Sequence, residues 1–163
     1  MKRAMRQRLT LMFAVAVLLA LAGWQWHRDA LSAPGTLLKI EPTRIHRIAL
    51  TLAGAPAMHY EKRAGHWWRM DGTPTRADDG RLGELANTAA AEVLSWRPAS
   101  DFQAAKIGLA PPLAVLVLNG HRLAFGGSSV TGPQSYVRVG DRVALVSEAY
   151  MPRPPITKIT DLH

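Results

Sequence analysis

The chain has 163 residues, of which 48% are hydrophobic and 20% are charged. This length and balance fit one globular domain and argue against wholesale disorder. The sequence contains no cysteine, which excludes disulfides, thiolate metal sites, thiol nucleophiles and the lipid-bearing cysteine of a bacterial lipoprotein.

The formal net charge of +8 is concentrated at the N-terminus. Half of it comes from four residues that precede the first apolar segment, which are Lys2, Arg3, Arg6 and Arg8. The remaining charge is spread along the chain, so the basic character indicates membrane topology more than a polyanion-binding surface. We therefore expect no nucleic-acid partner.

The N-terminal segment from Leu9 to Trp26 is uncharged and predicts a transmembrane signal anchor. A helix of this length is near the lower limit for crossing a hydrocarbon core of about 30 Å. By the positive-inside rule, the basic residues 1–8 stay in the cytoplasm, and the C-terminal part is exported to the periplasm. Trp24 and Trp26 fall at the far end, where indole rings favour the membrane interface. We expect a single-pass protein of the bacterial inner membrane.

Two processing outcomes stay open for this segment. Ala20-Leu21-Ala22 offers a small-x-small cleavage motif before Gly23, which would release a free periplasmic protein. The apolar run continues through that motif to Trp26, and this favours a retained anchor. A buried helix of a cytosolic domain is a third alternative, but such a helix would be expected to show a polar face.

Residues 27–43 predict a linker because they contain Pro34-Gly35 and Glu41-Pro42, although residues 37–40 would suit the start of a strand. The periplasmic domain is expected at 44–163. It opens with a β-meander, since alternating apolar residues and turn signals predict strands at 44–52, 58–63 and 66–70.

A main helix is predicted from 78 to 93, because apolar residues recur at steps of three and four. Thr75 and Asp78 fit a capping box, and Asp78 and Asp79 suit the positive end of a helix. A short strand at 94–97 and a short helix at 101–106 follow.

The last third of the chain predicts two hairpins. Asn119-Gly120 is a strong hairpin signal, and it joins predicted strands at 113–118 and 121–125. After a loop at 126–133, the second hairpin takes 135–139 and 142–146, and a final element begins at Ser147. The fold class is therefore α+β, with an antiparallel sheet of meander and hairpins and one main helix packed on one face.

Four sequence features follow one another along the domain. They are a Trp-containing strand before a proline and a helix (Trp68-Arg69-Met70, Pro74, Ala77-Asp78), a glycine-leucine-x-proline step (Gly108-Leu109-Ala110-Pro111), a strand-turn-strand ending in glycine (Leu116 to Gly126), and a tyrosine-led hairpin (Tyr136 to Val146). Together they resemble the bacterial family called domain of unknown function 4340. The resemblance implies a periplasmic domain on a single N-terminal helix, and larger members are similar to auxiliary components of gliding-type ABC transport systems. It implies no catalytic residue.

No catalytic residue, cofactor or metal site is predicted. His59 and His66 would lie on neighbouring strands near Glu61, but catalytic zinc needs three convergent protein ligands, and spacing supplies no third. Ser128 and Ser129 lack the glycine-x-serine-x-glycine elbow of a hydrolase, and no phosphate-binding loop follows them.

An interaction surface is the remaining prediction. Trp67 and Trp68 are adjacent in a strand and point to opposite faces, so one is expected in the core and the other at the surface. The predicted surface comprises Trp67, Trp68, Arg69, Tyr136 and Arg138. We expect a non-catalytic component of an envelope or transporter complex that binds a protein partner. The alternatives are an exported enzyme or ligand-binding domain with a site invisible in sequence, and basic loops that bind an anionic envelope polymer.

Overall fold

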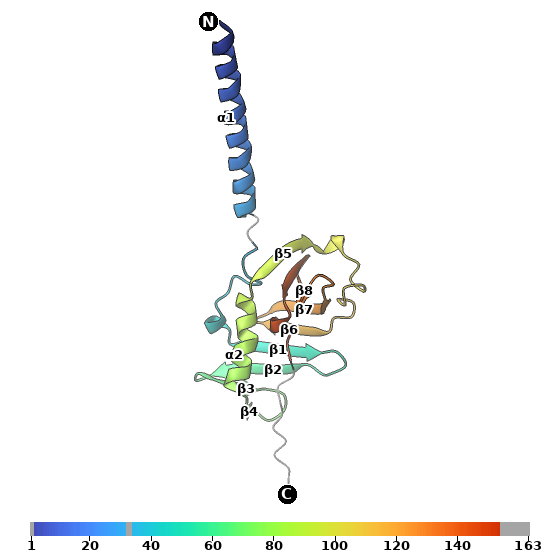
Figure 1. Cartoon of the computed structure of the whole chain (residues 1–163). Helices are drawn as coiled ribbons and strands as arrows, with labels where there is room; N and C mark the ends of the chain where they lie inside the picture. Colours follow the sequence, from blue (N-terminus) through green and yellow to red (C-terminus); the bar gives the residue numbers. More distant parts are fainter. Residues whose placement is uncertain (1, 32–33, 154–163) are drawn as a thin grey trace. The chain divides into compact units, whose positions relative to one another are not determined.

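The computed structural model of the chain describes residues 2–31 and 34–153 (Figure 1). It divides into two compact units, residues 1–33 and residues 34–163. The first unit is helix α1 (Lys2–Leu31), so the segment predicted as a linker begins inside this helix. Leu11, Phe13 and Leu19 of α1 are largely exposed, at 70%, 73% and 68%. In the part of the chain that the structure describes, no helix combines the length and apolar character that crossing a membrane requires.

The second unit is an antiparallel sheet of nine strands in the order β4-β3-β2-β1-β6-β7-β8-β9-β5 (Figure 1). The strand bounds are β1 (Arg47–Leu52), β2 (Met58–Arg63), β3 (His66–Arg69), β4 (Thr75–Arg76), β5 (Val93–Pro98), β6 (Ala114–Leu118), β7 (His121–Ser128), β8 (Gln134–Val139) and β9 (Arg142–Ser147). The predicted α+β class with antiparallel strands is confirmed. Two neighbouring pairs are out of sequence order: β1 lies beside β6, and β5 crosses to pair with β9.

Alternation of side chains along the strands gives the sheet a core face and an outer face. On the core face, Ile48 and Leu50 are buried, and they lie opposite Leu118 and Leu116 of β6. The residues between them, such as Ala49, point to the outer face and stay partly exposed. The period of two that the sequence shows at these strands therefore decides which residues form the core.

Helix α2 (Asp79–Asn87) covers the core face and lies across β1 to β3 in Figure 1. It buries Leu82 and Leu85 against the sheet. The helix is shorter than the predicted 78–93, which was wrong at its C-terminal end. After a short 3₁₀ turn (Thr88–Ala90), the backbone carbonyls of Ala89 and Ala91 accept from the N–H groups of Leu38 and Leu37 at 2.9 and 3.0 Å, so the chain turns extended and enters β5.

The segment 34–45 belongs to the folded unit. Leu37, Leu38 and Ile45 are buried in the main core beside the residues of α2. The expected strand at 37–40 is reduced to one β-bridge between Thr36 and Glu92, and a 3₁₀ turn at Pro42–Arg44 leads into β1.

Two local predictions in the second half were wrong. The helix expected at 101–106 is instead a 3₁₀ turn (Ala99–Asp101) followed by a loop, which covers part of the outer face and packs Leu109 against Ala124 and Val143. The loop expected at 126–133 begins later, because β7 continues to Ser128. In this extension the backbone N–H of Gly127 donates to the carbonyl of Ile107 at 2.8 Å.

The predicted capping box was also only half right. Asp78 is the N-cap of α2, and its side chain accepts from the backbone N–H of Arg81 at 3.1 Å. Thr75 lies in β4 and takes no part in the cap. The element expected after Ser147 is a 3₁₀ turn at Glu148–Tyr150.

Candidate functional site

The outer face of the sheet is open between β2 and β6. Val117 lies directly opposite Ala49 of β1 on one side and Arg122 of β7 on the other. A shallow groove of about 340 Å³ follows this row. Ala49, Met70 and Val117 are among its apolar lining, and Arg47, His59 and Glu61 are its charged or titratable side chains. The small side chains of Ala49 and Val117 on two central strands leave this hollow.

Besides Arg63 and Arg76, which are bound to Glu61 and Asp79, four exposed arginines lie on this face, one each from β1, β5, β7 and β8. They are Arg47, Arg97, Arg122 and Arg138. Register places them on the outer side, since Arg122 lies opposite Val117, and Arg138 and Arg97 both lie opposite Val143. Within the described residues none of the four has an acidic partner in ion-pair range. Glu61, which lies opposite Arg47 and also lines the groove, makes its ion pair with Arg63. The face therefore combines a mostly apolar groove with arginines that hold no ion pair of their own.

Two aspartates hold the ends of the β2–β3 hairpin. At one end, Asp71 Oδ2 accepts from the backbone N–H of His59, and its Oδ1 lies 2.8 Å from His59 Nδ1. Arg69 Nε donates to the same carboxylate at 3.4 Å. The backbone bond from His59 is the main cause that lowers the pKa of Asp71 below its ordinary value, followed by the bond from the His59 ring.

At the other end, Asp79 in the first turn of α2 makes the same kind of cluster. Its Oδ1 accepts from the backbone N–H of Trp67 at 2.6 Å, and its Oδ2 accepts from Arg76 Nη2 at 2.9 Å. His66 Nδ1 lies 2.8 Å from Oδ2 and 2.6 Å from Arg76 Nη2, so its tautomer decides whether it donates to the first or accepts from the second. The backbone bond from Trp67, then the bonds from His66 and Arg76, hold the pKa of Asp79 far below its ordinary value.

The two strand histidines are thus kept apart by separate aspartates. His59 is the second residue of β2 and His66 is the first of β3, and these antiparallel strands place them at opposite ends of the hairpin. No group of three potential metal ligands occurs among the residues described here. The geometry gives each histidine a structural role in tying a strand to a turn or helix.

The residues predicted as an interaction surface do not form one patch. Trp67 is 3% exposed and belongs to the core, with Lys62 Nζ 5.8 Å from its ring centroid. Trp68 is half-buried on the outer face opposite Glu61. Arg69 is bound to Asp71, as described above.

Tyr136 and Arg138 lie on the outer face of β8, and four strands separate them from Trp68. At roughly 4.8 Å per strand spacing this is a distance on the order of 24 Å. Tyr136 packs edge-on against Phe102, with ring centroids 5.6 Å apart, under the loop that covers this end of the face. Arg138 remains a surface residue. The groove residues Ala49 and Val117 were missed, although strand alternation placed both on the side opposite the core.

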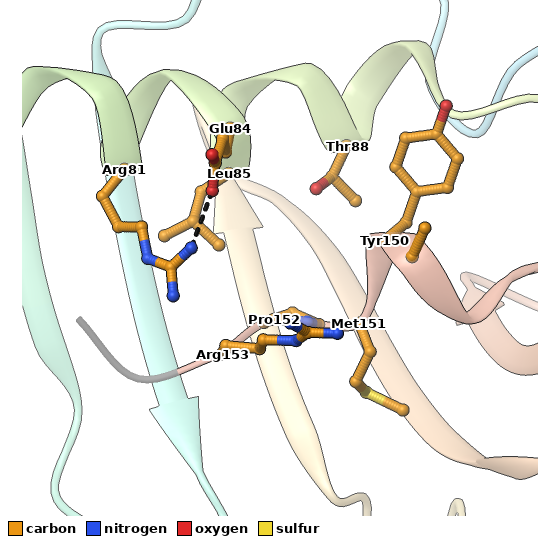
Figure 2. A pocket seen from close by; sticks show the side chains of 9 residues that line it. Arg81, Glu84, Leu85, Thr88, Tyr150, Met151, Pro152 and Arg153 are labelled. Carbon is orange, nitrogen blue, oxygen red and sulfur yellow. Dashed lines mark hydrogen bonds and ion pairs between the residues drawn. The ribbon is translucent and has the colours of Figure 1, made fainter. Parts of the chain in front are cut away.

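A second hollow of about 310 Å³ lies between α2 and the segment 149–153 (Figure 2). We call it the α2 pocket, and Arg81, Leu85, Thr88, Tyr150 and Arg153 define it. Arg81 Nη1 donates to Glu84 Oε2 at 2.9 Å on the helix side. Thr88 is 2% exposed, although it carries a hydroxyl. Sequence patterning did not reveal this pocket, because its two walls are more than sixty positions apart in the chain.

Comparison of the chain with family models, curated proteins and solved structures finds no match. The resemblance to domain of unknown function 4340 therefore stays a prediction.

Proposed function

We propose that this chain is a membrane-tethered, periplasmic accessory domain of a bacterial envelope complex, and that it binds a protein partner through its outer face without catalysing a reaction. The observation that carries the proposal is the pairing of the apolar groove at Ala49 and Val117 with exposed, unneutralised arginines on the same face. Exposed apolar hollows rimmed by polar groups are typical of interaction sites.

The chemistry of the face defines the partner. Arg47 lines the groove opposite Glu61, and Arg122 lies beside Val117. Because Glu61 is already paired with Arg63, the two arginines leave the groove with net positive charge, which favours an acidic counterpart over a basic one. The groove is apolar and shallow, so it suits one or two small apolar side chains. We infer an acidic protein segment with apolar residues between its carboxylates.

The tether is proposed from the segment 9–26 together with the charges before it. The segment is uncharged, and the basic residues at 2–8 orient it with its N-terminus in the cytoplasm. Along α1, apolar side chains such as Leu11, Met12 and Phe13 are exposed around the helix, and a helix that is apolar all round is stable only when something apolar surrounds it. The proposal depends on the whole segment, including Leu9 and Trp26, whose side chains lie outside the described set.

The resemblance to domain of unknown function 4340 supports the same role. That family is typically anchored by one N-terminal helix, and its larger members are similar to auxiliary components of ABC transport systems. A role in an envelope or transporter complex is therefore the context we propose for the partner.

Site-specific photo-crosslinking tests the partner. The full chain carries a benzophenone amino acid in place of Val117, or in place of exposed Thr43 as the matched control, and is irradiated in intact cells. We expect a discrete protein adduct at position 117 that is absent at position 43. Combining Arg47→Glu with Arg122→Glu should lower the adduct yield several-fold, because the rim charge would then repel the acidic partner.

Three outcomes would count against this proposal. An adduct that survives the double charge reversal would show that the rim does not select the partner. Adducts with lipid alone would indicate a membrane-facing surface, and adducts of twice the chain's mass would indicate self-association.

The tether has its own test. Membranes washed with alkaline carbonate should retain the full chain, and protease added to spheroplasts should degrade the domain while it spares the N-terminus. Release of the intact chain by carbonate would contradict a spanning anchor. The mass of the mature chain separates a retained anchor from cleavage after Ala22.

A further inference from the structure

We propose that the α2 pocket binds a carboxylate carried on a short apolar group, such as the C-terminus of a peptide that ends in an aliphatic residue. The pocket lies on the side of the sheet covered by α2, away from the outer face, so this inference is independent of the proposed partner site. Two guanidinium groups supply the charge. Figure 2 shows Arg81 reaching from α2 toward the segment that carries Arg153.

Arg153 supplies one of the two positive charges. Its side chain is exposed at the mouth of the pocket, and within the described residues no carboxylate lies in ion-pair range of it. Arg81 is already bound to Glu84 through Nη1, but a guanidinium carries five N–H donors in a planar fork. Both residues therefore keep donors for a planar oxyanion, and arginine binds carboxylates with two parallel bonds.

Thr88 supplies an independent polar group. It is 2% exposed, and its hydroxyl has no hydrogen-bond partner among the described residues. In Figure 2 the Thr88 side chain points from α2 into the pocket. Among the described residues the buried side-chain polar atom without a partner is Ser135 Oγ and not this hydroxyl, so the Thr88 hydroxyl counts as a group open to the pocket. There it can donate a hydrogen bond to a ligand oxygen.

The charge balance favours a carboxylate over a phosphate. Two arginines face the pocket, and Glu84 is already bound to one of them, which leaves about one unit of positive charge. A monoanion matches that balance, whereas a phosphate dianion would be repelled by Glu84 at close range. The other walls are apolar, since Leu85, Met151 and Pro152 line the hollow. Its volume of about 310 Å³ is at the lower end for ligand pockets and limits the apolar group to one short side chain.

The test uses N-acetyl-leucine as the probe and the full chain in zwitterionic detergent. Isothermal titration calorimetry should give saturable binding with one site. The neutral analogue N-acetyl-leucinamide has the same apolar body, and we expect it to bind at least about tenfold more weakly because it lacks the charge-assisted bonds. Isobutyl phosphate should also bind more weakly than N-acetyl-leucine.

Three variants locate the site. Arg153→Gln and Thr88→Val should each weaken N-acetyl-leucine about tenfold, in the range expected for a lost hydrogen bond to a charged group. Neither change removes a hydrogen bond within the described residues, so folding should be preserved, and the thermal midpoint checks this. Lys106→Gln, which removes an exposed positive charge that lies outside the linings of this pocket and of the outer-face groove, should leave the affinity unchanged.

The proposal is overturned if N-acetyl-leucine gives no saturable binding, or if its affinity is the same in Arg153→Gln as in the unmodified chain. Equal affinity for the amide would show that the carboxylate is not recognised. Tighter binding of isobutyl phosphate than of N-acetyl-leucine would show that the pocket prefers a phosphate to a carboxylate, and this would also overturn the proposal.

Discussion

The backbone N–H of Trp67 donates to Oδ1 of Asp79 at 2.6 Å, and this bond joins the first turn of α2 to the start of β3. The same carboxylate binds Arg76 and lies against His66. Asp71 repeats the arrangement at the other end of the hairpin, with His59 and Arg69. Two aspartates, each with one backbone and two side-chain partners, thus fix the edge of the sheet that α2 covers.

Replacing Asp79 by asparagine should destabilise the domain in a pH-dependent way. The pKa of Asp79 is lowered in the folded chain from its ordinary value of 3.8, so folding favours the charged carboxylate. Its contribution is fully present above about pH 4 and is lost as the pH falls through the lower folded-state pKa. Thermal unfolding of both proteins should therefore differ most near neutral pH, and the difference should shrink below about pH 4.

The control for this series is Asp101→Asn, because Asp101 is exposed and has no side-chain hydrogen bond in the described residues. Its midpoint should follow that of the unmodified chain at every pH. A constant difference between Asp79→Asn and the unmodified chain across the whole range would show that ionisation of Asp79 does not contribute.

Gly126→Ala should lower the free energy of unfolding by about 1–3 kcal/mol, as expected for overpacking. A Cβ at this position would overlap the carbonyl oxygen of Ile107 and lie 3.0 Å from Leu109 Cγ. Relief would require the loop to separate from β7 and to lose the bond between Gly127 and Ile107.

Gly132→Ala is the matched control, because a Cβ there meets only the end of Gln134 at 3.8 Å and φ is not positive. Urea unfolding followed by tryptophan fluorescence measures both variants. Equal midpoints for the two alanine variants would mean that the loop shifts to make room for the added methyl group without loss of stability.

Trp67 and Trp68 are neighbours with opposite environments, so alanine at each should have different costs. Trp67 is 3% exposed, and Trp67→Ala should lower the free energy of unfolding by about 3–5 kcal/mol. Trp68 is half-buried on the outer face, and Trp68→Ala should cost about 1 kcal/mol. Denaturant unfolding of the pair tests this assignment, and the reverse order would contradict the register of β3.

Ala64→Asn should stabilise the domain by about 1 kcal/mol, because a left-handed backbone is costly for alanine and is tolerated by asparagine. Ala64 has φ of 49° in the turn between β2 and β3, and Gly65 follows with φ of 81°. Asparagine before glycine is also the preferred sequence of such a two-residue turn. Ala57→Asn is the control, because Ala57 is exposed and does not have a positive φ. It should give no gain in thermal midpoint.

Much of the sheet was predictable, because its signals are local. The strand β2 has the predicted bounds, and Asn119-Gly120 forms the expected turn with φ of 49° and 91°. The end of α2 was not predictable, because Leu37 and Leu38 compete for the carbonyls that would have continued the helix. The extension of β7 likewise depends on Ile107, which approaches Gly127 from a distant part of the chain.

The sequence by itself determined the antiparallel α+β class, the alternation that buries Ile48 and Leu50, and the uncharged N-terminal segment with basic residues before it. These follow from periodicity and from local turn chemistry, which a short window contains. Only the tertiary structure decided that His59 and His66 bind separate aspartates, that Ala49 and Val117 share a groove, and that Thr88 faces Arg153 across a pocket. Each of these three relationships depends on strand order or on contacts between residues far apart in the chain, and no local sequence pattern contains that information.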